Sequence, residues 1–311
     1  MAKKKKTNIV QSPEYTPYDV SGTIPADAFA VLGADTENME AIKRPSISFM
    51  KDAWNRIRKS KVAVVCMILL AIIILGAIFF PMVIPFDYAK QNVAFQNQPM
   101  FTPDSVTGQM HLFGTDALGR DVFARIWYGA RVSLTVAVAV ALIDCVIGVI
   151  YGGVSGYFGG MVDNVMMRIL EVISGIPYMI IVILLMTVMD RGIGTIIIAY
   201  SLTGWTGMAR LVRGQVVSLK EQEFVTAAKA LGASNGRIIR KHLLPNCIGT
   251  LIVTATLQIP SAIFTEAFLS FLGLGVAAPM ASLGSLASDA ISSINSFPYR
   301  LFIPAVAISI I

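Results

Sequence analysis

The sequence has few charged residues. Asp, Glu, Lys and Arg make up 14% of the 311 residues, whereas 55% are hydrophobic, and the mean hydropathy is +0.68. In water-soluble globular domains about a quarter of the residues are charged. The composition therefore excludes a water-soluble globule and predicts a membrane protein.

The sequence also lacks the patterns that accompany most chemical sites. Its three cysteines lie in or beside apolar runs without CxxC spacing, and its two histidines, His111 and His242, are isolated in the sequence. These spacings support neither a disulfide framework nor a metal site. No G-x-x-x-x-G-K-[ST] string occurs, so the chain does not cradle ATP phosphates by itself. No set of nucleophile, base and metal ligands indicates an enzyme, and we expect no cofactor in this chain.

Positive charge is unevenly distributed along the sequence. The formal charge is +6, from 25 basic and 19 acidic residues, and the basic residues crowd into an N-terminal arm and a central loop. This distribution is typical of the cytoplasmic segments of membrane proteins rather than of a nucleic-acid-binding surface. We therefore expect membrane lipid but no nucleic acid among the partners, and a cytoplasmic N-terminus.

The N-terminal part divides into four segments by composition. Residues 1–45 are polar with scattered prolines, which predicts a flexible cytoplasmic arm. Residues 46–61 alternate apolar and basic side chains, which predicts a basic amphipathic helix on the inner leaflet. Residues 62–85 begin with a charge-free run long enough to be the first transmembrane helix. Residues 86–130 are polar and predict an external segment.

Residues 131–311 predict a transmembrane core, and together with the first span they give an all-α polytopic membrane protein of six spans. The glycine-rich residues 151–163 are expected to form a tight inner turn. The last apolar run starts at Leu301 and is cut off at Ile311, too short to cross a bilayer, so we expect either a fragment or a re-entrant last helix. The five expected core spans are about 132–152, 164–189, 195–211, 243–265 and the run from 301.

Ionisable residues within the apolar runs are the candidates for a translocation path, because charge at membrane depth is costly. Asp144 lies deep in the second span, where it either faces a water-filled passage or accepts hydrogen bonds from a neighbouring Ser or Thr. Glu266 ends the fifth span and is expected near the interface. Arg168 and Glu171 are three residues apart, which favours a mutual ion pair over a substrate contact.

The most informative stretch is a polar loop at residues 220–246, which contains EFVTAAKALGASNGRIIRKHLLPN. Four apolar residues recur there at helical spacing and predict one narrow face: Phe224, Ala227, Ala228 and Leu231. Gly232 is expected to stop this helix, Ser234 to cap a second short one, and Pro245 to begin the next apolar run. From spacing alone, the loop is either an ordinary cytoplasmic connection or a knob that docks in another protein.

Three strings resemble a known family. The spacing of Ala227, Ala228, Gly232, Leu244 and Pro245 resembles the EAA loop of ABC importer permeases. The string GTDALGRDVFAR in the external segment resembles GTD-x-x-GRD-x-x-(S/A)R, and EAFLSFLGLG resembles E-x-x-LSFLGLG, both found in the peptide and nickel branch of that family. The chain departs from the family pattern at three positions: Thr226 replaces a Glu, His242 an Ile and Leu283 a Trp.

The resemblance implies a type I ABC importer transmembrane domain, of the kind found in the oligopeptide C-type subunit, in a prokaryotic cell membrane. It implies a second permease subunit, two ATPase subunits that bind ATP and Mg²⁺, and an external substrate-binding lipoprotein. It implies uptake of peptides, or alternatively of nickel. The residues expected to couple to the ATPase are Glu223, Phe224, Ala227, Ala228, Leu231, Gly232, Leu244 and Pro245.

A different class, the ion-coupled secondary transporter, remains as an alternative to the ABC importer. Such a protein is expected to show inverted repeats with paired broken helices and a buried ionisable relay. The sequence shows one deep carboxylate, Asp144, and no evident repeat.

Overall fold

The computed structural model describes residues 49–104 and 108–311, which fall into two units that divide between Lys59 and Ser60. The predicted arm 1–45 lies outside the described residues. The first unit contributes helix α1 (Phe49–Ile57), where the Arg58 guanidinium lies 5.6 Å from the Trp54 ring centroid. The helix expected over 46–61 is thus shorter at its C-terminal end, and its interfacial position stays a prediction.

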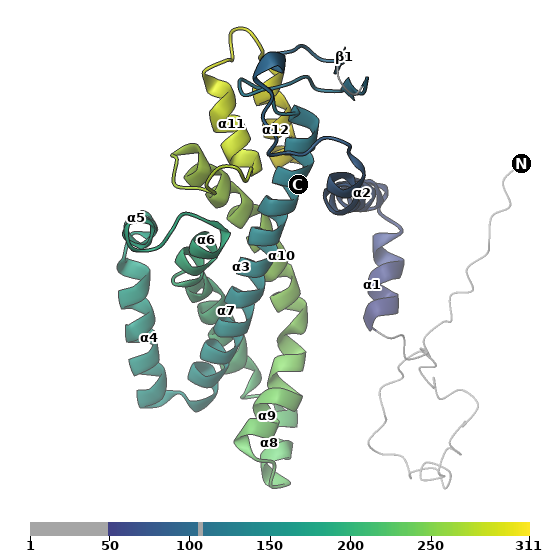
Figure 1. Ribbon diagram of the computed structural model, residues 1–311. Helices are drawn as coiled ribbons and strands as arrows, with labels where there is room; N and C mark the ends of the chain where they lie inside the picture. Colours follow the sequence, from purple (N-terminus) through teal and green to yellow (C-terminus); the bar gives the residue numbers. More distant parts are fainter. Residues whose placement is uncertain (1–48, 105–107) are drawn as a thin grey trace, which may run out of the picture. The chain divides into compact units, whose positions relative to one another are not determined.

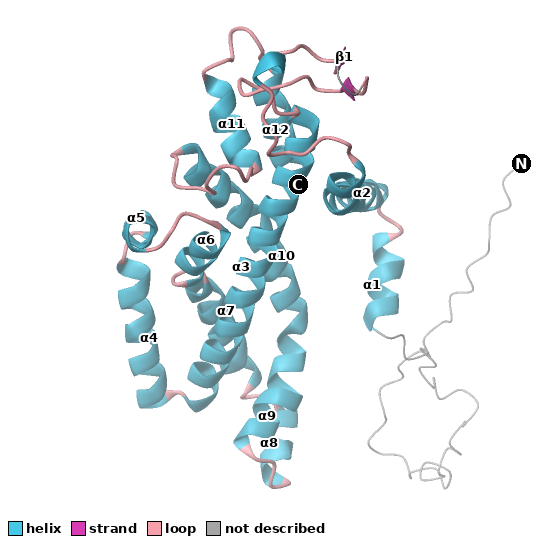
Figure 2. Cartoon of the chain, viewed as in Figure 1, coloured by secondary structure: helices cyan, strands magenta, loops and turns pink. Residues whose placement is uncertain are grey.

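In the described part of the second unit the regular structure is helical apart from a two-stranded antiparallel hairpin between α2 and α3, in the segment predicted to be external (Figures 1 and 2). Its elements are α2 (Lys61–Val83), η1 (Val93–Phe95), β1 (Thr102–Pro103), β2 (Met110–His111), α3 (Val122–Phe158), α4 (Gly160–Gly175), α5 (Tyr178–Val188), α6 (Ile193–Ser201), α7 (Trp205–Leu219), α8 (Glu223–Ala230), α9 (Asn235–Ile238), η2 (Ile239–Leu243), α10 (Leu244–Phe271), α11 (Leu283–Ile291) and α12 (Tyr299–Ile310).

Three helical stretches of the described chain are long and apolar enough to cross a membrane: α2, α3 and the continuous run Asn235–Phe271. The pair α4 and α5 would make a fourth span if it is counted as one bent helix. The all-helical membrane fold expected from the sequence is therefore present. The number of six spans stays a prediction, because α6, α7 and α12 are each too short to meet the same criterion.

Helix α3 is the central element, and it packs along α7 and α10. The turn predicted over 151–163 is present but much shorter, because α3 continues to Phe158 and the chain turns at Gly159 and Gly160, whose φ angles are +64° and +52°. Gly148, Gly152 and Gly156 lie one above another on α3. A Cβ on Gly152 would lie 2.2 Å from the Ala209 carbonyl oxygen, so these glycines allow α7 to approach closely.

The third and fourth expected spans are each interrupted. Helices α4 and α5 meet at a 74° bend, because Pro177 lacks an N–H and forces Ile176 into an extended conformation. The run 195–211 divides into α6 and α7 at a turn in which the Tyr200 carbonyl accepts hydrogen bonds from the amides of Thr203 and Gly204. Both runs are mainly apolar, so their composition did not indicate these breaks.

Helix α2 is attached to α3 through a backbone carbonyl that lacks its usual partner within the helix. Pro81 removes the N–H that would bond the Ala77 carbonyl, and Arg131 Nε donates to that oxygen instead at 2.9 Å. The Trp127 ring fills the space beside Gly76, where a Cβ would lie 2.2 Å from the ring. Arg131 and Trp127 thus both pack α2 against α3.

Candidate functional site

The hairpin formed by α8, α9 and their connecting turn is mounted on a buried face. Val225 and Ala228 of α8 are buried, and Val225 belongs to a core cluster with Ile238, Leu243 and residues of α7 and α10. The prediction that Ala228 shares a face with Phe224 and Ala227 was therefore wrong. Val225 was missed, although its spacing of three from Ala228 could have indicated a second, inner face.

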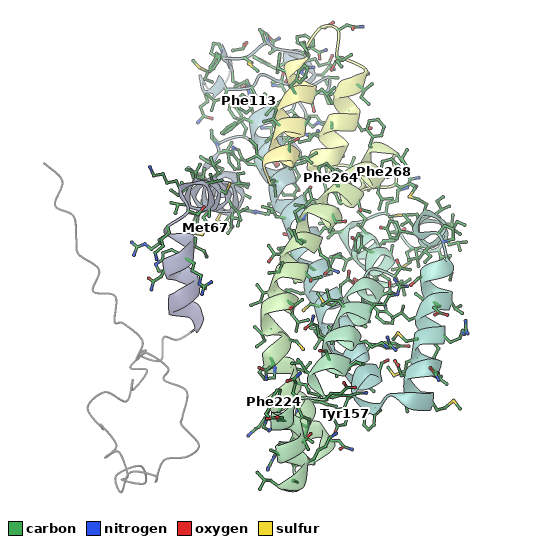
Figure 3. The ribbon with its side chains drawn as sticks, turned by 180° about the vertical axis from the view of Figure 1, so that it is seen from behind. Met67, Phe113, Tyr157, Phe224, Phe264 and Phe268 are labelled. Carbon is green, nitrogen blue, oxygen red and sulfur yellow. The ribbon has the colours of Figure 1, made fainter. Side chains whose placement is uncertain are left out.

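The opposite face of α8 presents apolar side chains to the surroundings. Phe224 is 40% exposed, Leu231 just after the helix is 88% exposed, and Ala227 between them is also exposed. These three residues, spaced i, i+3 and i+7, are called the outer face of the hairpin. Exposed apolar groups at this spacing are typical of a helix that lies in a groove of a partner protein. Figure 3 labels Phe224 at this end of the molecule and Phe113 at the other.

Gly232 ends α8 through its backbone conformation. Its φ is +78°, and its N–H and that of Ala233 donate to the carbonyls of Lys229 and Ala228, as in a glycine-terminated helix. A Cβ at Gly232 would have nothing within 4 Å, so conformation alone requires glycine here.

The second expected short helix is the end of a long one. Residues Asn235–Phe271 form one helix of 37 residues that begins after Ser234 and includes a π-helical turn at Ile239–Leu243. Leu244 and Pro245 therefore lie inside this helix, just after the π-helical turn, rather than between two elements. The prediction of two short helices at a bend was therefore wrong, because α8 is followed by the N-terminal extension of α10.

Several polar contacts join the hairpin to the C-terminal end of α3. Tyr157 Oη donates to Asn235 Oδ1 at 2.8 Å, and the Lys229 ammonium lies 5.8 Å from the Tyr157 ring centroid. Lys220 Nζ donates to the Gly156 carbonyl at 3.0 Å. Glu223 is exposed in the first turn of α8, where a negative charge interacts favourably with the helix dipole. A force on α8 would therefore reach both α3 and α10.

Asp144 is fully buried in the middle of α3. Its Oδ2 lies against the break between α6 and α7, where a Cβ on Gly204 would approach it to 2.2 Å. Neither carboxylate oxygen has a hydrogen-bond partner among the described residues, which does not support the alternative of a bond from a neighbouring Ser or Thr. A buried carboxyl group without a partner is unfavourable by several kcal/mol unless it is protonated or gains a ligand. Asp144 therefore stays a candidate for the path.

Glu266 is buried in a network of hydroxyl groups. Ser133 Oγ and Ser270 Oγ donate to its two carboxylate oxygens at 2.8 and 2.7 Å, and Ser282 Oγ donates to Ser270 Oγ at 3.1 Å. Its expected position near the membrane interface stays a prediction. The network joins α3, α10 and the start of α11, so Glu266 holds these helices together, and its place on a translocation path stays a prediction.

The external segment builds a charge cluster at the N-terminal end of α3. Asp116 Oδ2 accepts hydrogen bonds from Arg120 Nε at 2.7 Å and Arg125 Nη1 at 3.0 Å. These bonds fix a turn before α3, whereas Asp121 takes part in other contacts. It caps α3 by accepting from the Ala124 amide at 2.6 Å, and its other oxygen lies 2.7 Å from His111 Nδ1. Burial raises the pKa of the Asp121 carboxyl, although both hydrogen bonds oppose that shift.

The comparisons with known proteins match almost the whole chain. The sequence model of the binding-protein-dependent transport system inner membrane component matches residues 146–311, and that of the N-terminal transmembrane domain of oligopeptide transport permease C matches residues 48–99. The dipeptide transport system permease protein DppC of Bacillus subtilis is 49% identical over 97% of this chain and 92% of the relative. This chain belongs to the binding-protein-dependent ABC importer permeases.

Other relatives of this permease carry similar names. The oligopeptide transport system permease protein OppC is 48% identical in Bacillus subtilis over 91% of this chain and 90% of the relative. The protein of the same name in Escherichia coli is 43% identical over 83% of this chain and 84% of the relative. This chain also resembles a solved structure of the MetNI methionine ABC transporter in inward-facing conformations. The match covers 58% of this chain and 87% of the chain in that structure, with 19% identity and a TM-score of 0.49.

Some of the features described above lie within the residues that the first family model matches. Residues 146–311 contain the hairpin, Glu266 and the two broken helix pairs, whereas Asp144 and the charge cluster at Asp116 precede them. In the permease the hairpin thus combines a buried inner face, an exposed outer face and polar bonds to α3.

Proposed function

We propose that this permease imports peptides, and that ATP hydrolysis in separate ATPase subunits drives it through the hairpin. The observation that carries the proposal is the outer face, because Phe224 and Leu231 expose apolar side chains while Val225 fixes the same helix to the core. A rigidly mounted apolar helix suits a groove in another protein. The partners would be a second permease subunit, two ATPase subunits and an external substrate-binding lipoprotein.

The hairpin would face the cytosol. Five basic residues lie in or beside it, which agrees with the excess of positive charge on the inner side of membrane proteins: Lys220, Lys229, Arg237, Arg240 and Lys241. The N-terminus would lie on the same side, since α2 is a single span between it and the external segment. The permease would then reside in a prokaryotic cell membrane in contact with lipid.

Movement of the ATPase subunits would be transmitted along two long helices. Helix α3 and the run Asn235–Phe271 each have 37 residues, which at about 1.5 Å per residue extends each to about 55 Å. The Tyr157–Asn235 and Lys220–Gly156 bonds attach the hairpin to both. Closure of the ATPase pair would pull the hairpin inward and rotate these helices from an inward-facing to an outward-facing arrangement.

Peptides are the substrate class that the relatives favour. The relatives at 49% and 48% identity are named as dipeptide and oligopeptide permeases, which does not favour the nickel alternative. The two broken helix pairs would also be expected of an ion-coupled carrier. That alternative, however, gives the exposed outer face of the hairpin no partner. Membership in a family of binding-protein-dependent permeases favours the ATP-driven mechanism.

The proposal can be tested in proteoliposomes that contain both permeases, both ATPases and the binding protein. Replacing Phe224 and Leu231 with Ser is expected to abolish ATP-driven peptide uptake and to release the ATPase subunits during purification. Ala230→Ser is the matched control, because Ala230 is exposed on α8 but lies about 100° around the helix from the outer face. Uptake driven by an ion gradient without any ATPase subunit would reject the proposal in favour of the carrier.

A further inference from the structure

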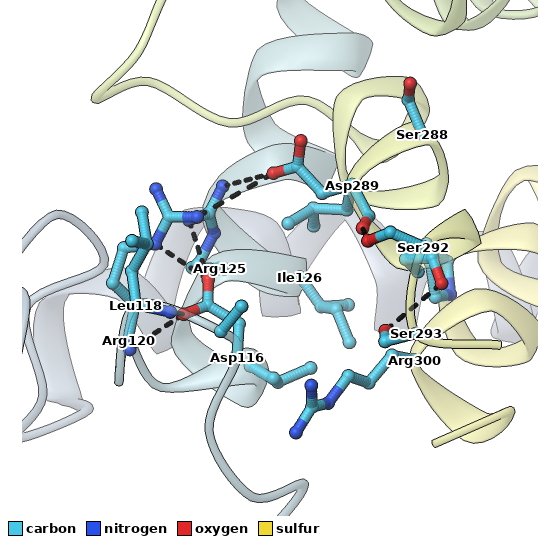
Figure 4. A pocket seen from close by; sticks show the side chains of 15 residues that line it. Asp116, Leu118, Arg120, Arg125, Ile126, Ser288, Asp289, Ser292, Ser293 and Arg300 are labelled. Atoms are coloured by element: carbon cyan, nitrogen blue, oxygen red, sulfur yellow. Dashed lines mark hydrogen bonds and ion pairs between the residues drawn. The ribbon is translucent and has the colours of Figure 1, made fainter. Parts of the chain in front are cut away.

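A cavity lies between the external segment and helices α11 and α12, at the N-terminal end of α3 (Figure 4). Its volume is about 360 Å³, roughly ten times the ~30 Å³ that one water molecule occupies in the liquid. The hairpin lies at the other end of α3, about 55 Å away for 37 residues at ~1.5 Å each. If the hairpin is cytosolic, the cavity opens on the external side.

The cavity is lined by five charged residues that are unequally paired. Arg120 and Arg125 both bond to Asp116, and Asp289 on α11 lies 3.7 and 3.4 Å from their guanidinium groups. Two carboxylates thus neutralise two of the three arginines. The third, Arg300 on α12, has no carboxylate partner among the described residues.

Arg300 is 5% exposed, yet two of its nitrogens are unbonded. Its Nη1 donates to Asn97 Oδ1 at 2.7 Å, and its guanidinium carbon lies 3.9 Å from the Phe297 ring centroid. Its Nε and Nη2 find no acceptor in the described part of the chain. A buried guanidinium without a counter-charge is strongly unfavourable, and a carboxylate that accepts two parallel N–H bonds is the group that best relieves it.

The other residues that line the cavity offer contacts for a ligand larger than a simple anion. Val122, Ile126 and Leu286 provide apolar lining, and Ser293 lies near Arg300 in Figure 4. In the same view Asp289 and Arg300 lie on opposite sides of the cavity, and the Asp289 side chain is 58% exposed. Because Asp289 is already paired with Arg120 and Arg125, Arg300 is the charge in this cavity that is left for a ligand.

We propose that this cavity binds the C-terminal carboxylate of a peptide that enters the permease, and that Arg300 is the residue that bonds it. The inference rests on the proposed peptide import and assigns it a substrate contact on the external side. Arg300 would accept peptides with a free carboxylate and discriminate against peptides whose C-terminus is neutral.

The test compares ATP-driven uptake of a tripeptide with that of its C-terminal amide in the complete complex. Arg300→Gln is expected to lower the preference for the free acid over the amide about tenfold, with uptake of the amide unchanged. Because the binding protein contributes the same preference to every sample, only the change between variants counts. Arg300→Lys, which keeps the charge but loses the planar fork, should show an intermediate preference. Arg191→Gln, at an exposed arginine in the turn before α6, should keep the original preference.

Two results would overturn the inference. One is an unchanged preference in Arg300→Gln. The other is an equal loss of uptake for both peptides, which would mean that Arg300 supports the fold or bonds a carboxylate of the binding protein. If Arg300→Gln does not assemble, thermal unfolding of the unmodified complex without binding protein decides: the free acid should raise Tm and the amide should not, and equal shifts would contradict the inference. Absence of any ATP-driven peptide uptake by the unmodified complex would instead refute the proposed function.

Discussion

The two ends of α3 differ in which side chains are exposed and which are buried. At the hairpin end, apolar Leu231 and Phe224 are exposed, while Lys220 bonds to a backbone carbonyl of α3 and Lys229 lies over the ring of Tyr157. At the other end, Arg125 is buried against Asp116, and Arg300 is buried without a carboxylate partner among the described residues. An exposed apolar face suits a protein partner, whereas buried charge suits a small polar ligand. This difference underlies our proposals of energy coupling at one end and substrate contact at the other.

The largest effect is expected from breaking the charge cluster at the outer end. Asp116→Ala would leave Arg120 and Arg125 with only the more distant Asp289, and removing one partner of a buried ion pair costs about 3–5 kcal/mol. Thermal unfolding in detergent should show a large loss of stability. Glu221→Ala, at an exposed carboxylate beside the hairpin, is the control and should change the unfolding free energy by less than about 0.5 kcal/mol. Equal effects at both ends would contradict the comparison.

The next effect concerns the packing that connects the two ends. Gly152→Ala would place a methyl group 2.2 Å from the Ala209 carbonyl and push α7 away from α3, with an expected cost of about 1–3 kcal/mol. Stability is measured by thermal unfolding, and uptake per ATP hydrolysed should fall as well. Gly249→Ala on α10 has nothing within 4 Å of the added methyl group and should be neutral. Full stability of Gly152→Ala would mean that α3 and α7 do not pack as described.

A smaller effect is expected at the hairpin turn. Gly232→Ala must adopt a φ of +78° with a Cβ, which costs about 1–2 kcal/mol, although no atom obstructs the methyl group. ATPase activity should become less dependent on peptide, because α8 is held less firmly. Gly236→Ala lies in the helix α9 and should stabilise that turn slightly. The reverse order of the two variants would show that the turn is not glycine-dependent.

The smallest effect is expected from one hydrogen bond between the hairpin and α3. Tyr157→Phe removes the bond to Asn235, which contributes about 0.5–1.5 kcal/mol. Asn235→Ala should produce the same small loss, and the double variant should add little to either. Additive losses, measured as unfolding free energies, would mean that the two side chains act separately.

Much of the fold was predictable because its signals are local. Long charge-free runs located α2 and α10, and Gly232 marked the end of α8 through a requirement of its own backbone. The bond between Arg168 and Glu171 was also correctly expected from their spacing of three, and their side chains lie 2.9 Å apart.

The errors concern contacts between distant segments. Gly152 indicates a turn when it is considered alone, and only the presence of α7 beside it shows that it is a packing residue. The network around Glu266 was not predicted, because Ser133, which bonds it, is 133 positions away in the sequence. Arg300 carried no signal in the sequence, since its missing counter-charge is visible only once α12 is folded against the external segment.

The central claim, that the outer face of the hairpin lies in the cytosol against an ATPase subunit, is tested most directly at its most exposed residue. Leu231→Cys, in a chain whose three native cysteines are replaced by Ser or Ala, is treated with a membrane-impermeant maleimide in inside-out vesicles. The account predicts rapid labelling there, none in intact cells, and strong protection when the ATPase subunits are bound. Labelling from outside intact cells, or labelling that the ATPase subunits leave unchanged, would contradict it.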